Sequence, residues 1–113
     1  MGLAWDDRAL QLLAHQRPGQ AVVITLVPLR GYGEVLTVKC CSVRAAACTP
    51  VFVWLEDQQG VPVYAHRRVA AYVRWKTLRL TTWSLACWRY LAVEREIEVW
   101  YDLIRWERTH SAM

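Results

Sequence analysis

The chain has 113 residues, of which 55% are hydrophobic and seven are tryptophan, and its net charge is +4. That length fits one domain, residues 1–113, with a core that needs no disulfides. The longest apolar run, AVVITLVPL, is far shorter than the roughly 20 residues of a membrane-spanning helix. The opening residues MGLAWDDR lack the pattern of a signal peptide. We therefore expect a cytoplasmic protein with reduced thiols and no membrane partner.

The first half of the chain predicts a helix followed by two strands. WDDRALQLLAHQ has helical spacing, and Asp6 can cap it. QAVVITLVPL has β-branched residues at successive positions, which indicates a strand covered on both faces. EVLTVKCCS alternates, with Leu36, Val38 and Cys40 on one face. VRAAACTP has no regular pattern, and we expect a loop there.

The second half predicts a hairpin, a helix, two strands and a final segment of mixed character. VFVWLEDQQGVPVYA indicates a hairpin that turns near Gly60. HRRVAAYVRW fits a short helix, and TLRLTTW and CWRYLAVE fit strands, with Leu78 and Leu80 facing inwards. EREIEVWYDLIRWERTH fits either a strand or a helix, and we expect a helix over roughly residues 97–108. These elements define a small, mostly-β α+β domain with an N-terminal helix, a short mid-chain helix and a C-terminal helix.

Two stretches resemble HesB-like domains, which comprise the A-type iron–sulfur assembly proteins and their small relatives with a Cys-Cys or Cys-selenocysteine motif. GVPVYAHRRVAAYV followed by LRLTTWSLACWRYLAVE is similar to the second half of these domains. The opening helix and AVVITLVPLRGYG look like their first third. The resemblance covers roughly residues 6–94 and leaves residues 95–113 as an extension. It implies an iron–sulfur cluster or a metal ion as cofactor.

The ligand cysteines of that family are not matched in this sequence. RGYGE stands where the family has its first ligand cysteine, so Tyr32 or a neighbour replaces the thiol. The A-type proteins end in Cys-x-Cys, whereas no cysteine follows Cys87. The resemblance therefore implies a non-enzymatic HesB-like protein with a degraded ligand set, related to iron–sulfur cluster, thiol or metal handling.

The four cysteines admit two interpretations. Cys40 and Cys87 are expected to be small buried side chains, since cysteine is among the most often buried residue types. Adjacent residues of a strand point to opposite faces, so Cys40 and Cys41 cannot both face one metal unless the strand bulges. Cys41 is the better functional candidate because it shares a face with Lys39, and nearby positive charge favours a thiolate. The candidate metal ligands are Cys41 and Cys48, with Cys40 and Cys87 as less favoured partners.

A block of positive charge gives an alternative function. Residues 58–93 contain six basic and no acidic side chains. Aromatic residues alternate with them over residues 64–90, a pairing typical of nucleic-acid sites. The other interpretation places the rings in the core and the charges in solvent. Basic residues at the start of a helix oppose its dipole, which favours a module that binds nucleic acid or an acidic protein surface through Arg67, Arg68, Arg74 and Lys76.

Enzyme signatures are absent, and the last segment indicates self-association. The sequence has no phosphate-binding loop, nucleophile elbow or His-Glu-x-x-His motif. One face of the expected C-terminal helix gathers Ile97, Trp100, Tyr101 and Ile104, with Trp106 nearby. Monomers rarely expose such apolar faces. The face should cover the chain's own sheet or a neighbour, and we expect a homodimer or higher oligomer, besides any protein client.

Overall fold

The structure, a computed structural model, describes residues 2–31 and 33–110. The described residues form two mixed sheets and four helices, which confirms the α+β class predicted from the sequence. Their order is β1 (Gly2–Trp5), α1 (Asp7–Ala14), β2 (Gln20–Leu29), β3 (Gly33–Ser42), α2 (Val43–Cys48), β4 (Phe52–Gln58), β5 (Val61–His66), α3 (Arg67–Val73), β6 (Thr77–Leu85), β7 (Trp88–Val93) and α4 (Glu96–His110).

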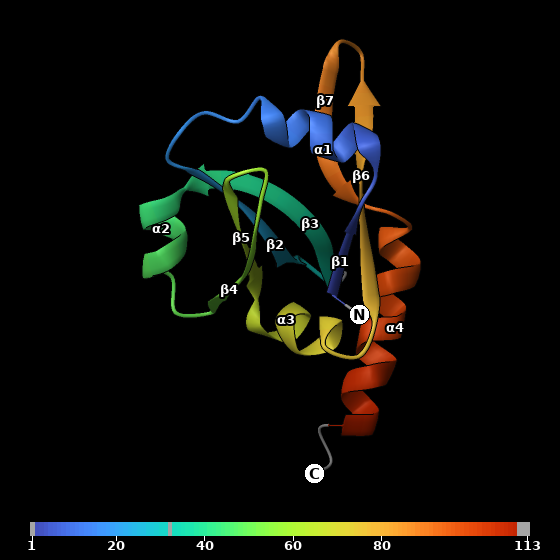
Figure 1. The fold of residues 1–113 in the computed structure, drawn as a ribbon. Helices are drawn as coiled ribbons and strands as arrows, with labels where there is room; N and C mark the ends of the chain where they lie inside the picture. The colour runs from blue at the N-terminus through green and yellow to red at the C-terminus, as the bar shows by residue number, and fades with distance from the viewer. Residues whose placement is uncertain (1, 32, 111–113) are drawn as a thin grey trace.

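The strands form two mixed sheets. In the four-stranded sheet the order is β3-β2-β5-β4, and β2 runs parallel to β5 while the other pairs are antiparallel. In the three-stranded sheet β6 lies between β1, which is parallel to it, and β7, which is antiparallel. Figure 1 shows α2 beside the four-stranded sheet, α3 at the lower end and α4 along one side. The β6–β7 hairpin projects at the opposite end from α3.

The main core lies between the two sheets and under α1, α3 and α4. It includes Val22 and Ile24 of β2, Leu78 and Leu80 of β6 and Leu103 of α4. A smaller cluster on the other face of β2 joins its alternate residues to Ala46 of α2. Both faces of β2 are therefore covered, which confirms the interpretation of its continuous β-branched pattern.

The caps of the first two helices explain where each begins. Asp6 accepts a hydrogen bond from the Ala9 amide at 2.8 Å, as the predicted cap of α1 requires. The prediction of a loop over VRAAACTP is wrong, because residues 43–48 form α2. Ser42 caps this helix by accepting from the Ala45 amide at 3.1 Å, and the alanines that follow favour a helix.

The elements of the second half follow the sequence predictions more closely. The β4–β5 hairpin turns at Gln59 and Gly60, both with positive φ. The helix expected at residues 97–108 is α4, which begins directly after Arg95, where a positive φ of 54° changes the direction of the chain. The described elements also include a short strand, β1, which the sequence analysis did not predict.

Helix α4 packs mostly on its own chain. Leu103 is 1% exposed, and Val99, Trp100 and Trp106 pack against the main core. The prediction of one covered apolar face on this helix is therefore only partly correct, because the side chain of Ile97 is 68% exposed to solvent. Within the part of the chain that the structure describes, no helix combines the length and apolarity needed to cross a bilayer.

The packing of α4 leads to a stability prediction. Leu103→Ala should lower the free energy of unfolding by about 2–4 kcal/mol, because it removes a fully buried side chain between α4 and the sheets. The matched control is Leu29→Ala, at a leucine that is 44% exposed, and it should cost about 1 kcal/mol or less. Urea denaturation followed by circular dichroism measures both. Equal losses in the two variants would contradict this account of how α4 is held.

Candidate functional site

The four cysteines are distributed over three regions. Cys41 is half-buried and packs against the cluster that contains Ala46, while Cys48 ends α2 on the same side of the sheet. Cys40 faces the opposite side, and Cys87 lies in the turn between β6 and β7. The prediction that Cys40 and Cys87 are core residues is wrong, since both are exposed.

The surroundings of the thiols support at most a partial ligand set. Partial desolvation raises the pKa of the Cys40 thiol, and neighbouring Cys41 raises it further, which favours the neutral form. Among residues 2–31 and 33–110, no three His, Cys, Asp or Glu side chains are grouped so that they could hold a metal ion. Tyr32, at the position of the family's first ligand, lies outside the described residues.

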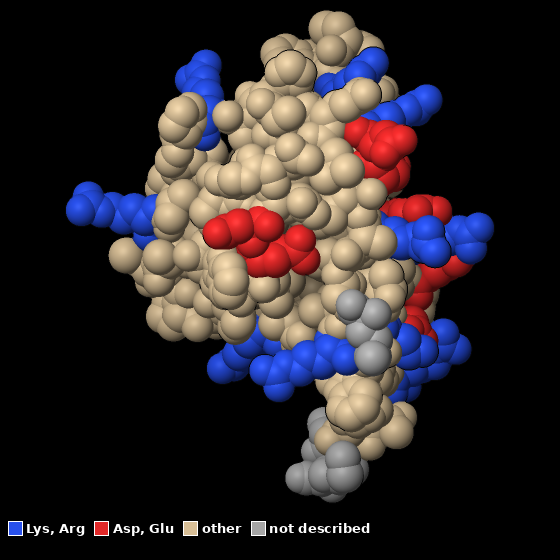
Figure 2. All heavy atoms as spheres, viewed as in Figure 1, with Lys and Arg blue, Asp and Glu red and all other residues tan. Residues whose placement is uncertain are grey.

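Of the four predicted anion-binding residues, two form ion pairs within the chain and two do not. Arg68 pairs with two carboxylates of the chain, and the Lys76 ammonium lies 3.7 Å from a carboxylate oxygen of Asp102. Arg67 and Arg74 are exposed and form no ion pair with any described residue. Figure 2 shows Lys and Arg side chains along the lower edge, where Figure 1 places α3. Of these four residues, Arg67 and Arg74 are therefore the two that present an unpaired charge to solvent.

Arg68 joins three elements through two carboxylates. Its guanidinium donates to both oxygens of Glu34 on β3, at 2.8 Å each. It also donates to both oxygens of Glu107 on α4, at 2.8 and 2.7 Å. These bonds raise the pKa of Arg68 and hold the pKa of Glu34 below its ordinary value. Arg68 thus binds two carboxylates of its own chain. This corrects the prediction from the sequence that Arg68 binds an external anion.

A solvent-facing apolar surface covers one face of the projecting hairpin. Residues of β6 and β7 that oppose each other share a face, and the pairs Trp83–Tyr90 and Leu85–Trp88 occupy the face opposite Leu80. Their exposed fractions run from 45% for Tyr90 to 65% for Trp88. The Trp83 and Tyr90 ring centroids are 6.1 Å apart with planes tilted by 33°. We call these four side chains the hairpin surface.

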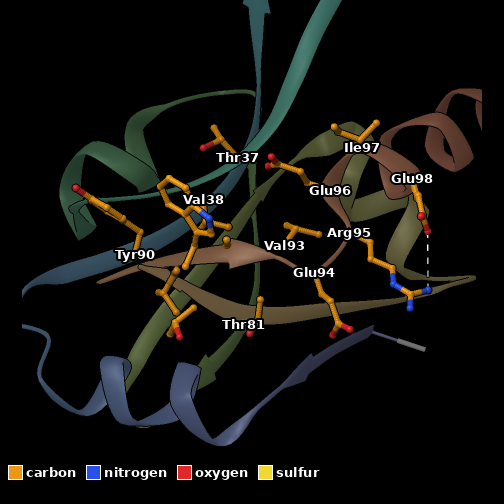
Figure 3. Close-up of a pocket in the computed structure, with 14 residues that line it drawn as sticks. Thr37, Val38, Thr81, Tyr90, Val93, Glu94, Arg95, Glu96, Ile97 and Glu98 are labelled. Atoms are coloured by element: carbon orange, nitrogen blue, oxygen red, sulfur yellow. Dashed lines mark ion pairs between the residues drawn. The ribbon is translucent and has the colours of Figure 1, made fainter. Parts of the chain in front are cut away.

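The hairpin surface continues into a groove at its base. The groove has a volume of about 770 Å³ and lies between β7, the first turn of α4 and β3. Trp83 and Tyr90 line it together with Ile97, so its apolar lining is continuous with the hairpin surface. Figure 3 shows Tyr90 at one end and Glu94, Arg95 and Glu98 at the other.

The charges around the groove are mostly acidic. Its lining includes Glu94, Glu96 and Glu98, and one basic residue, Arg95. The Arg95 guanidinium lies 3.9 Å from a Glu98 oxygen, and both side chains are largely exposed. Such an ion pair contributes little stability in water. The carboxylates are therefore available to a basic partner group.

The basic and aromatic groups predicted to share one surface lie apart. Strand β6 runs from α3 at one end of the molecule to the hairpin tip at the other (Figure 1). Arg67 and Arg74 lie at the α3 end, whereas Trp83 and Trp88 lie in the hairpin. A signal for the hairpin surface was present in the sequence. Leu78 and Leu80 face inwards, so alternation places Trp83 and Leu85 outwards.

Comparison with known proteins yields no relative. No family model, no curated protein and no solved structure matches the chain. The HesB-like resemblance and its metal or cluster therefore stay predictions.

The Arg68–Glu34 contact leads to a pH prediction. The pKa of Glu34 is lowered in the folded state, so its ionised form stabilises folding at pH values above its ordinary pKa of 4.5. That contribution should be lost as pH falls through the lower folded pKa. Glu34→Gln should therefore reduce the free energy of unfolding by about 1–3 kcal/mol at neutral pH, and the difference from wild type should shrink below pH 4.5.

Denaturation series over pH measure this difference. The control repeats the comparison in an Arg68→Met background, where the main cause of the lowered pKa is removed. There the pH-dependent part of the Glu34→Gln effect should be smaller. An unchanged pH dependence would contradict the assigned role of Arg68.

Proposed function

We propose that the protein is a non-catalytic binding domain that engages another protein through the hairpin surface and the groove. The observation that carries the proposal is the exposure of four large apolar side chains on one face of a projecting hairpin. Contiguous exposed apolar patches are typical of interaction sites. Aromatic residues are also enriched in the cores of protein interfaces.

The chemistry of the site favours a partner segment that is both apolar and basic. Apolar side chains of the partner would contact Trp83, Tyr90 and Ile97, and its Lys or Arg groups would pair with glutamates such as Glu94. Nucleic acid is disfavoured on this face, because phosphates would lie next to those carboxylates. Arg89 does not offset them, since its place in the strand register puts it on the opposite face of the hairpin.

The proposal can be tested with a phage-displayed library of random short peptides selected on the immobilised protein. We expect enriched peptides that combine large apolar residues with Lys or Arg. Their affinity should fall about tenfold or more in Trp83→Ser, which removes a ring that lines both surfaces. Glu94→Gln should weaken basic peptides more than neutral ones and make their binding less dependent on salt.

Trp54→Ser is the matched control, because this tryptophan is similarly exposed, at 54%, but lies on β4 and does not line the groove. It should leave peptide affinity unchanged. Denaturation curves exclude unfolding as the cause of lost binding. Selection of no peptide above background, or peptides indifferent to Trp83→Ser, would overturn the proposal.

A second candidate is the thiol or metal-handling role implied by the HesB-like resemblance. It is favoured by one placement, since Cys41 and Cys48 lie on the same side of the four-stranded sheet. If they bind a cluster or metal, anaerobic reconstitution with iron and sulfide should give visible absorbance that Cys41→Ser abolishes. Cys40→Ser, on the opposite face, is the control and should retain it. Absence of absorbance in the wild-type protein would exclude a cluster.

A further inference from the structure

We infer that the partner segment that fits the groove is the β6–β7 hairpin of a second copy of this chain, in a twofold dimer. This inference rests on the proposed function and assigns the partner. In a twofold interface the same patch packs on itself. The two hairpin surfaces would lie face to face and antiparallel, so that each tip reaches the groove of the other copy.

The sizes of the side chains along the hairpin fit this arrangement. On the outer face, cross-strand pairs follow one another from the tip: Leu85–Trp88, Trp83–Tyr90, then Thr81–Ala92. With the twofold axis at the Trp83–Tyr90 pair, the large tip pair of one copy opposes the small Thr81–Ala92 pair of the other. Large against small side chains is the condition for close packing of two faces.

The charges do not oppose this arrangement. From Leu80 to Val93 the chain contains a single charged side chain, Arg89, which lies on the inner face, so the outer face of the inserted tip is uncharged. The groove that receives it presents Glu94, Glu96 and Glu98 against one arginine. The tip therefore brings no negative charge next to these carboxylates, and the buried rings supply most of the affinity.

The available apolar area is close to what a specific dimer needs. The exposed parts of the hairpin surface and Ile97 amount to roughly 600 Å² per copy, taking about 150–250 Å² for each large side chain. Stable interfaces bury about 800 Å² per partner. The groove walls would contribute the rest. An interface of this size corresponds to association at micromolar concentration or tighter.

Sedimentation equilibrium of the full chain at micromolar concentration tests the inference. We expect a species of twice 13.1 kDa. Ala92→Trp adds apolar surface but fills the space that the opposing tip needs, so it should weaken the dimer about tenfold or more. Trp88→Ser should weaken it similarly. Trp54→Ser, on β4, should leave the dimer unchanged.

Crosslinking tests the antiparallel register. With the axis at the Trp83–Tyr90 pair, Leu85 of one copy lies opposite Thr81 of the other, because each is two residues from Trp83 along β6. In a chain whose four cysteines are replaced by serine, Thr81→Cys combined with Leu85→Cys should form intermolecular disulfides under copper-phenanthroline oxidation. Thr81→Cys combined with Ser84→Cys, which lies on the inner face of β6, is the control and should not.

The outcomes separate this inference from the proposed function. A 13.1 kDa species that still binds the selected peptides would overturn the dimer and leave the proposed function standing. A monomer that binds neither peptides nor a second copy would overturn both. A dimer indifferent to Ala92→Trp and Trp88→Ser would place the interface elsewhere and overturn the inference. A monomer whose tryptophan fluorescence responds to anionic vesicles or to DNA would also overturn it.

Discussion

The bidentate contacts of Arg68 with Glu34 and Glu107 set the position of α4, on which the candidate site depends. The guanidinium is shared between β3 and α4 from the first turn of α3, and the Trp100 indole donates to Glu34 at 3.2 Å as well. Loss of one member of such a cluster leaves partly buried charges without partners, which costs more than the intact cluster contributes. The cluster therefore fixes one arrangement of α4 against β3.

That arrangement creates the groove. The first turn of α4 supplies Glu96 and Ile97, and β3 supplies Thr37 and Val38 on the opposite wall. Leu103 anchors the middle of α4 in the core. Displacement of α4 from β3 would separate the two walls of the groove. The Arg68 charge cluster, although distant from the hairpin, therefore determines whether the groove exists for a partner to bind. The same helix leaves Ile97 exposed at the edge of that surface.

Sequence patterns predicted most of the elements, because each has a local cause. The Asp6 cap and the β-branched run of β2 are examples. Helix α2 was missed although Ser42 and its alanines carried the signal, and β1 has no local signal because pairing with β6 creates it. Cys40 was misplaced because alternation gives the face but not how far the core extends along an outer strand. The groove depends on contacts between distant segments, which a sequence pattern does not contain.

The hairpin surface combines exposure with order. Trp83 and Tyr90 oppose each other across the strands and their rings lie in contact range, so each restricts the rotamers of the other. Binding a partner at rings that are already restricted therefore costs less side-chain entropy than binding it at flexible groups that must first become ordered. The tip pair, Leu85 and Trp88, is more exposed and carries more of that cost. The central ring pair is thus suited to begin recognition, and the tip gains order only when an opposing surface covers it.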